Sequence, residues 1–201
     1  MSGPPPDVPE GYPVGLEREV VHADGTRYHV RPIRPDDADR LAAFHATLST
    51  RSTYLRFFRV HPVLTPGELE QFTHVDYRDR LALVAEDADR LLAVGRYDRL
   101  PGDGEAEIAF VVSDEYQHHG IGALLLDELA RAGWDRGITI FVAETLAENR
   151  PMIDVFSSSG FPVTSTREYD TVILRFPVEP TPTYRKALAR REATRGAAAP
   201  C

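Results

Sequence analysis

The chain has 201 residues, 42% of them hydrophobic, which is enough to fill one core of ordinary size. No apolar run approaches the roughly 20 residues that a membrane-spanning helix needs, and the N-terminus has no basic segment followed by an apolar one. The expected location is therefore the cytoplasm. The formal net charge of −8 disfavours nonspecific nucleic-acid binding and permits basic acceptors such as lysine-bearing surfaces. The single cysteine, Cys201, excludes an intrachain disulfide and disfavours a structural zinc site.

The predicted organisation is one folded domain between two tails. Residues 1–20 are expected to form a disordered leader, because their first 13 residues are rich in proline and glycine. Residues 21–178 are expected to fold. The basic stretch 179–201, rich in Pro, Arg and Ala, is expected to remain an unpacked tail. A helix over 184–195 is the alternative for that tail, although it lacks a convincing apolar stripe.

Strand and helix signals mix along the domain, so the chain is predicted to be an α/β protein. The predicted strands are 27–33, 81–86, 91–98, 106–112, 138–142, 163–168 and 171–176. The predicted helices are 35–48, 52–58, 66–73, a leucine-rich one from 121 to about 135, and a short one that ends before 159–161. This pattern predicts a mixed central sheet of about seven strands with helices on both faces.

The most informative segment is a strand, a glycine loop and a helix, in that order. Strand 106–112 leads into Gln117-His118-His119-Gly120-Ile121-Gly122, and the leucine-rich helix follows. Backbone N–H groups in the first turn of a helix lack carbonyl partners and lie at the positive end of its dipole, so they form an anion site. Gly120 and Gly122 lack side chains, which lets a diphosphate approach these groups. The loop has neither the lysine-containing pattern of nucleoside triphosphatases nor the three spaced glycines of dinucleotide folds.

This loop, Gln-x-x-Gly-x-Gly after an apolar strand, resembles the signature Gln/Arg-x-x-Gly-x-Gly/Ala of the GNAT superfamily of acetyl-CoA-dependent N-acetyltransferases. A second block supports the resemblance: strand 138–142 precedes Asn149, which opens a short helix closing with Gly160-Phe161. The resemblance covers roughly residues 27–177. It implies the GNAT fold and acetyl-CoA as the donor substrate.

Within that superfamily, the strings 106–112 and 144–149 look like those of bacterial protein lysine acetyltransferases, some of which modify acyl-CoA synthetases. This resemblance implies direct transfer of the acetyl group to a primary amine, preferably a protein lysine, without a covalent enzyme intermediate. Such relatives often carry a fused sensing or synthetase-like domain, and none is visible here, which leaves regulation and substrate open.

Glu107 is the predicted general base, acting directly or through one water. A lysine amine has a pKa near 10.4 and must lose a proton before it attacks the thioester. Glu107 occupies the position that carries the catalytic Glu in the lysine acetyltransferases, and alternation places it opposite Ile108, Phe110 and Val112. A solvated strand carboxylate is the alternative role. Glu105, two residues away on the same face, is the main rival for the base.

The resemblance also implies the residues that hold acetyl-CoA. Backbone groups of Val111 and Val112 would hold the pantetheine arm and polarise the acetyl carbonyl. Gln117 would order the loop, and Asn149 would cap its helix and lie near the CoA arm. The diphosphate would be bound by the N–H groups of His118, His119, Gly120, Ile121, Gly122 and Ala123.

Two features of this site need separate interpretation. The adjacent His118 and His119 have no Cys or carboxylate at ligand spacing, so they are assigned to the phosphate loop and not to a metal site. Many GNAT enzymes carry a Tyr seven residues after the Asn, where it can protonate the departing thiolate. Here that position is Phe156, so protonation comes from elsewhere or the thiolate leaves unassisted, which its low pKa makes feasible.

Other charged clusters are given structural roles. Asp36, Asp37 and Asp39 are interpreted as a helix N-terminal charge cluster. A solvated helix face is preferred for the cations of 51–59, although they border the acceptor cleft in GNAT folds and could meet an acidic acceptor. These cations are Arg51, Arg56 and Arg59.

Two further functions remain open from sequence. One is N-acetylation of a small amine such as an antibiotic, a polyamine or an amino acid. The other is a noncatalytic acetyl-CoA-binding module that reports acyl-CoA levels to a partner. No metal, nucleic acid or membrane is expected to take part.

Overall fold

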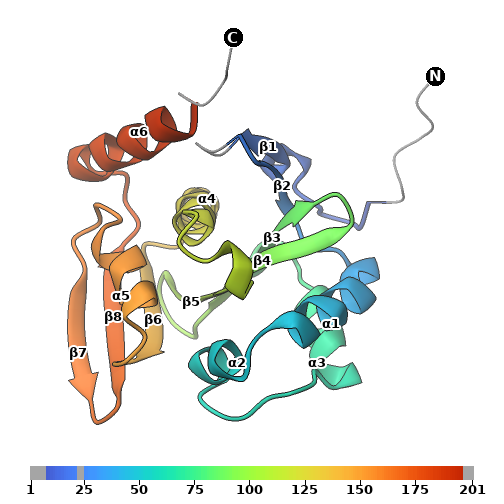
Figure 1. The fold of residues 1–201 in the computed structure, drawn as a ribbon. Helices are drawn as coiled ribbons and strands as arrows, with labels where there is room; N and C mark the ends of the chain where they lie inside the picture. The colour runs from blue at the N-terminus through green and yellow to red at the C-terminus, as the bar shows by residue number, and fades with distance from the viewer. Residues whose placement is uncertain (1–7, 22–24, 197–201) are drawn as a thin grey trace, which may run out of the picture.

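A computed structural model describes residues 8–21 and 25–196, and it has one open sheet with helices on both faces (Figure 1). The strand order is β1-β2-β3-β4-β5-β6-β8-β7, and every neighbouring pair is antiparallel except β5 and β6. The strands are β1 (Arg18–Val21), β2 (Arg27–Pro32), β3 (Arg80–Asp87), β4 (Arg90–Arg99), β5 (Glu105–Val112), β6 (Ile140–Leu146), β7 (Thr164–Glu168) and β8 (Thr171–Pro177). The mixed α/β architecture predicted from sequence is confirmed, with eight strands in place of about seven.

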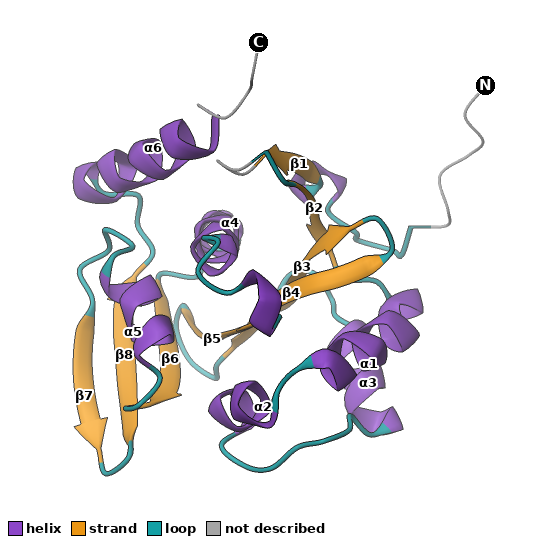
Figure 2. Cartoon of the chain, in the orientation of Figure 1, coloured by secondary structure: helices purple, strands orange, loops and turns teal. Residues whose placement is uncertain are grey.

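Six α-helices cover the two faces of this sheet (Figure 2). They are α1 (Ala38–Thr47), α2 (Thr50–Phe57), α3 (Pro66–Thr73), α4 (Ile121–Asp135), α5 (Arg150–Ser157) and α6 (Pro182–Gly196). Helices α1, α2 and α3 lie on one face, and α4 lies on the other face with α6 beyond it (Figure 1). In the described part of the chain, no helix is long and apolar enough to cross a membrane.

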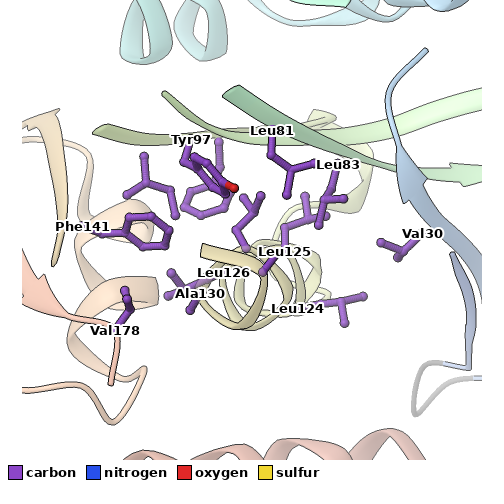
Figure 3. Packing of buried hydrophobic residues seen from close by; sticks show 14 of the residues in the cluster. Val30, Leu81, Leu83, Tyr97, Leu124, Leu125, Leu126, Ala130, Phe141 and Val178 are labelled. Carbon is purple, nitrogen blue, oxygen red and sulfur yellow. The ribbon is translucent and has the colours of Figure 1, made fainter. Parts of the chain in front are cut away.

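Two apolar clusters, one on each face, hold the helices to the sheet. The larger cluster joins α4 to the sheet, and Figure 3 shows Leu125 and Leu126 of α4 beneath Leu81 and Tyr97. The smaller cluster joins α1 and α3 to the other face through residues such as Phe44. Because β3 and β4 are covered on both faces, they read as nearly continuous apolar runs.

The folded part begins earlier than the predicted boundary at residue 21. Tyr12 and Leu16 are buried, and β1 pairs with β2 along its whole length. The leader was predicted from its proline and glycine content, which does not reveal that Tyr12, Leu16 and Val20 contact the core. The part of the leader from 1 to 7 lies outside the described residues.

Strand β6 also differs from its prediction of 138–142. Ile138 is buried but precedes the strand, whereas pairing with β8 continues to Leu146, opposite Thr171. The apolar pattern stopped at Val142 because Glu144 interrupts it. Backbone pairing, which does not depend on apolar side chains, extends the strand.

The basic stretch after 178 forms a packed helix instead of the expected loose tail, so the alternative prediction of a helix was the better one. The ring of Tyr184 stacks on Phe161 with centroids 4.0 Å apart. Gly160 lies so close to α6 that a Cβ there would come within 2.7 Å of Ala187. Leu188 also packs against the core, and Arg191 bonds to Asp127 of α4, so a short apolar contact and one ion pair hold the helix in place of a long apolar stripe. Residues 197–201, including Cys201, lie outside the described part.

Candidate active site

The site begins where β5 and β6 separate. The two strands pair only over Glu105–Glu107 and Ile140–Val142, and their remaining residues have no mutual register. On its other edge β5 stays paired with β4 as far as Val112. Backbone N–H and C=O groups of residues 108–112 on the edge that faces β6 are therefore available to an extended molecule.

A cavity of about 420 Å³ fills this separation. This volume falls within the roughly 300–1,000 Å³ that small-molecule sites occupy. Five elements line the cavity: the second half of β5, the middle of β6, the first turn of α4, most of α5, and α2. The cavity therefore lies between the sheet edge and the helices, and the glycine loop forms part of its wall.

The glycine loop places the start of α4 against this cavity. Gly120 has φ of 74° and is the N-cap of α4, which has no side-chain cap. Within the described residues no side chain caps the first-turn N–H groups, so they can bind an anion. A Cβ built on Gly122 would meet only Val155 at 3.6 Å, an ordinary contact, so the protein itself does not require glycine there. The space suits an approaching phosphate group.

Gln117 and Asp114 fasten the loop to α2. The Gln117 side chain donates to Ser52 Oγ at 3.2 Å and to the Val112 carbonyl oxygen at 3.3 Å. Asp114 accepts from Ser49 N–H at 3.0 Å and from the hydroxyls of Ser49 and Ser52 at 2.7 and 2.8 Å. Burial alone would raise the pKa of Asp114, but these hydrogen bonds hold it below its usual value. The carboxylate stays charged and joins the loop to the helix opposite.

The wall formed by β6 and α5 supplies polar groups and one aromatic ring. Asn149 is buried and caps α5, its side-chain oxygen accepting from Met152 N–H at 3.3 Å. The buried hydroxyl of Thr145 has no hydrogen-bond partner in the described residues although it lines the cavity. Phe156 is 1% exposed and packs between Phe110 and Phe176. Phe156 is therefore a core residue as well as part of the cavity wall.

Three glutamates lie on the sheet face that α1, α2 and α3 cover. Glu107 is exposed while Ala106 and Ile108 beside it are buried, which confirms the predicted alternation. Because Glu107 pairs in register with Val142, Glu144 on β6 projects from the same face. Glu144 lines the cavity, and Glu107 is not among its lining residues. Glu107 makes no hydrogen bond or ion pair within the ranges that the structure describes.

Glu105 is engaged elsewhere. Its two carboxylate oxygens accept from the guanidinium of Arg175 on β8. This hydrogen bonding, together with the charge of Arg175, lowers the pKa of Glu105 below its usual value. A carboxylate held in this way is a weaker base than a free one.

Arg56 of α2 lies near Glu107 and borders two cavities. It lines the main cavity and also a small one of about 40 Å³ between α1, α2, α3 and the sheet. Burial, and then the charge of Arg96, lower the pKa of Arg56 to about 10, against the opposing charges of Glu107 and Asp98. Its guanidinium lies 5.2 Å from the centre of the Phe57 ring. Arg56 therefore keeps a positive charge at neutral pH close to Glu107.

Comparison with known proteins agrees with this geometry. The model of the acetyltransferase (GNAT) family matches residues 47–161. Acetyltransferase PA5475 of Pseudomonas aeruginosa is 30% identical over 142 residues, which are 69% of this chain and 76% of that protein. The crystal structure of the GNAT domain of S. lividans PAT is 39% identical with a TM-score of 0.78, covering 83% of this chain and 99% of that one.

The chain belongs to the GNAT acetyltransferase family. It is an acetyl-CoA-dependent N-acetyltransferase. Acetyltransferase Pat of Mycolicibacterium smegmatis is also 30% identical over 139 residues, which are 68% of this chain. The chain spans only 41% of the length of that relative.

The residues of this GNAT acetyltransferase fit acetyl-CoA. An extended pantetheine arm has amides that can pair with the free edge of β5, and the orphan hydroxyl of Thr145 offers a further partner. The uncapped N-terminus of α4 suits a diphosphate. In the described residues no cluster of three or more His, Cys, Asp or Glu side chains could hold a metal ion.

Most of the residues that sequence reasoning selected meet at this cavity in the GNAT acetyltransferase. Two of them, Glu107 and His119, do not line it. Glu107 lies on the sheet face opposite α4, and the centre of the His119 ring lies 6.1 Å from that of the Tyr116 ring. The predicted residues that line the cavity are Val111, Val112, Gln117, His118, Gly120, Ile121, Gly122, Ala123 and Asn149.

Sequence reasoning missed three contributors to the site. Glu144 and Thr145 belong to the family string 144–149, but sequence reasoning gave them no role. Their place in that string was a usable signal, since both residues line the cavity. Asp114 had no signal, because its partners Ser49 and Ser52 are more than 60 residues away in the chain.

Proposed function

We propose that this GNAT acetyltransferase moves the acetyl group of acetyl-CoA to the side-chain amine of a lysine in a protein. Its likeness to the acetyltransferase Pat and to the GNAT domain of PAT supports this acceptor, as do the family strings at 106–112 and 144–149. An acyl-CoA synthetase is one candidate acceptor. The observation that carries the chemistry is the carboxylate of Glu107, which is exposed and has no ion-pair partner among residues 8–21 and 25–196. It lies on the sheet face opposite α4, beside the point where β5 and β6 separate.

Glu107 acts as the general base in this proposal. It accepts the proton from the lysine ammonium, directly or through one water, and the neutral amine then attacks the thioester carbonyl. The C–N bond forms as the C–S bond breaks, and the electron pair of the C–S bond leaves with the CoA thiolate. The nitrogen now bonded to the acetyl carbon releases a second proton to water, and the thiolate takes up a proton from water. Backbone groups of Val111 and Val112 polarise the carbonyl as negative charge develops on its oxygen.

The donor is held by the remaining site residues. The first-turn N–H groups of α4 bind the diphosphate, and Gln117 keeps the loop in place. Asn149 and Thr145 lie along the pantetheine arm. With no tyrosine at the position of Phe156, the departing thiolate leaves without a proton from that side chain.

Glu144 is a second candidate for the base because it lines the cavity itself. Glu105 is a weaker candidate because Arg175 lowers its pKa. Single Gln substitutions of the three glutamates separate these possibilities. The pH profile of kcat/KM is the readout, since a lost general base removes the rise of activity with pH.

The test of the acceptor is incubation of the protein with radiolabelled acetyl-CoA and a cell lysate, followed by separation of protein and small-molecule fractions. Label on protein lysines that is lost in Glu107→Gln, while acetyl-CoA binding is retained, supports the proposal. Label only in small molecules would move the function to amine N-acetylation. Binding without transfer in any fraction would instead indicate a noncatalytic acetyl-CoA-binding module.

A further inference from the structure

We infer that residues 51–65, which comprise most of α2 and the loop that follows it, dock the acceptor protein and select an acidic and apolar surface around its target lysine. This inference rests on the proposed function and names the kind of partner. The residues 51–65 are called the docking segment below.

The docking segment concentrates exposed apolar side chains. The described part of the chain has eight large hydrophobic residues with exposed side chains, and four of them fall between positions 54 and 63. They are Tyr54, Phe58, Val60 and Val63. Val60 is 71% exposed and Val63 is 70% exposed. Single exposed hydrophobic residues are ordinary, but a group of them marks an interaction site.

The charge of the docking segment is the opposite of that of the whole chain. It contains Arg51, Arg56 and Arg59 and no Asp or Glu, whereas the chain has a net charge of −8. Arg51 is exposed, with no ion pair among the described residues, and Arg59 makes only a 3.3 Å contact with Glu68 while 66% exposed. These cations complement an acidic surface and disfavour a basic one.

The docking segment borders the main cavity. Ser52, Leu55 and Arg56 line the cavity for acetyl-CoA, so a protein bound to the outer side of the segment has its lysine within reach of the site. Figure 1 shows the loop after α2 and the turn between β7 and β8 at the same, lower end of the molecule. Tyr169 in that turn is 96% exposed and adds a further apolar side chain at this end.

The exposed side chains are held outward by buried neighbours. His61 and Leu64 are buried between the exposed positions, and the His45 ring N–H donates to the His61 carbonyl oxygen at 2.7 Å. The loop ends at a capping box in which Thr65 and Glu68 bond reciprocally. A loop anchored in this way presents Val60 and Val63 in fixed positions, which reduces the ordering cost of binding a partner.

The experiment measures how fast the intact protein transfers the acetyl group of acetyl-CoA to each of three acceptors. One is N-acetyl-lysine methylamide, and two are 13-residue peptides with one lysine and the same apolar residues, flanked by either Asp/Glu or Arg. The variants are the pairs Arg51→Gln with Arg59→Gln, and Val60→Ser with Val63→Ser. Controls on other surfaces are Arg185→Gln and Val14→Ser, both at exposed positions.

The unmodified enzyme should prefer the acidic peptide by at least about fivefold in kcat/KM, and the preference should weaken with added salt. The arginine pair should bring that ratio close to one. The valine pair should raise KM for both peptides. Neither pair should change kcat/KM for the lysine methylamide, and the controls should match the unmodified enzyme.

Equal use of both peptides, or equal losses in the control variants, would overturn the docking role. It would leave the proposed lysine transfer intact, since transfer would still be measured. No transfer to any lysine compound by a protein that binds acetyl-CoA would instead contradict the proposed function itself.

Discussion

Arg191 of α6 forms a two-point ion pair with Asp127 of α4, with Nη2 to Oδ1 at 2.7 Å and Nε to Oδ2 at 3.1 Å. Asp127 is 3% exposed, and a carboxylate at that depth needs a partner. The same guanidinium donates to the carbonyl oxygens of Ser158 and Ser159 at 3.3 and 3.0 Å. Because Ser158 lines the cavity, α6 supports one part of the cavity wall.

Replacing Arg191 should therefore destabilise the fold. Arg191→Ala leaves Asp127 buried with weaker partners, of which the Tyr184 hydroxyl at 3.3 Å is one. We expect the free energy of unfolding to fall by about 2–3 kcal/mol, which is below the usual cost of breaking a buried pair because Arg191 is partly exposed. Urea unfolding followed by circular dichroism measures this change.

Arg185→Ala is the matched control for that experiment. Arg185 lies on the same helix with an exposed side chain, so its loss should change stability by less than about 0.5 kcal/mol. Equal urea midpoints for Arg191→Ala, Arg185→Ala and the unmodified protein would show that α6 does not stabilise the domain.

The elements that sequence patterns predicted well are those whose determinants lie in consecutive residues. Pro66 to Thr73 was found with its observed ends because a capping residue, a proline and a glutamate coincide at its start. The glycine loop and α4 were found because backbone geometry and helical periodicity are written in consecutive residues. For the same reason most residues that line the cavity beside the glycine loop could be named in advance.

Features that depend on contacts between distant residues could not be predicted. The helix α6 has no apolar stripe, and the ring stack of Tyr184 on Phe161 together with Arg191 holds it. Likewise β1 owes its place to pairing with β2. Neither interaction produces a long periodic pattern of apolar residues in the sequence. Composition therefore predicted a disordered leader and an unpacked tail.

A carboxylate at position 122 should weaken acetyl-CoA binding and not the fold. A Cβ at this position would contact only Val155 at an ordinary distance, and an acidic side chain in the first turn of a helix interacts favourably with the helix dipole. Gly122→Glu should therefore fold with equal or higher stability, whereas its negative charge should repel the diphosphate and weaken acetyl-CoA binding at least about tenfold. Isothermal titration calorimetry and thermal unfolding measure the two effects.

Gly95→Ala provides the contrast to Gly122→Glu. A Cβ on Gly95 would lie 2.6 Å from the Phe110 ring, so the core must shift, and we expect the free energy of unfolding to fall by about 1–3 kcal/mol. Unchanged acetyl-CoA affinity in Gly122→Glu would contradict the assignment of this loop to the diphosphate.

Asp114 should control the affinity for acetyl-CoA without touching it. Asp114→Ala removes the bonds to Ser49 and Ser52 and thus loosens Gln117, which shares the Ser52 hydroxyl. We expect KM for acetyl-CoA to rise about three- to tenfold with a smaller change in kcat. Glu115→Ala, at the exposed neighbouring acid, is the control and should leave KM unchanged.

The ion network around Arg31 should set the acid stability of the domain. Arg31 donates to both oxygens of Asp37 at 2.7 Å and to Glu86 at 2.9 and 3.0 Å. Burial alone would raise the pKa of both carboxyls, but Arg31 holds each pKa below its usual value of 3.8 or 4.5. Their contribution is therefore complete above about pH 4.5 and is lost as pH falls through the lowered values.

Arg31→Met tests this network. At pH 7 the variant leaves two buried carboxylates without their main cation, and the free energy of unfolding should fall by about 3–5 kcal/mol. Without Arg31 the pKa of each buried carboxyl rises, so the variant should lose less stability than the unmodified protein as pH falls from 6 to 3. Urea midpoints measured across this range decide the matter, and parallel curves for the two proteins would show that other groups govern acid unfolding.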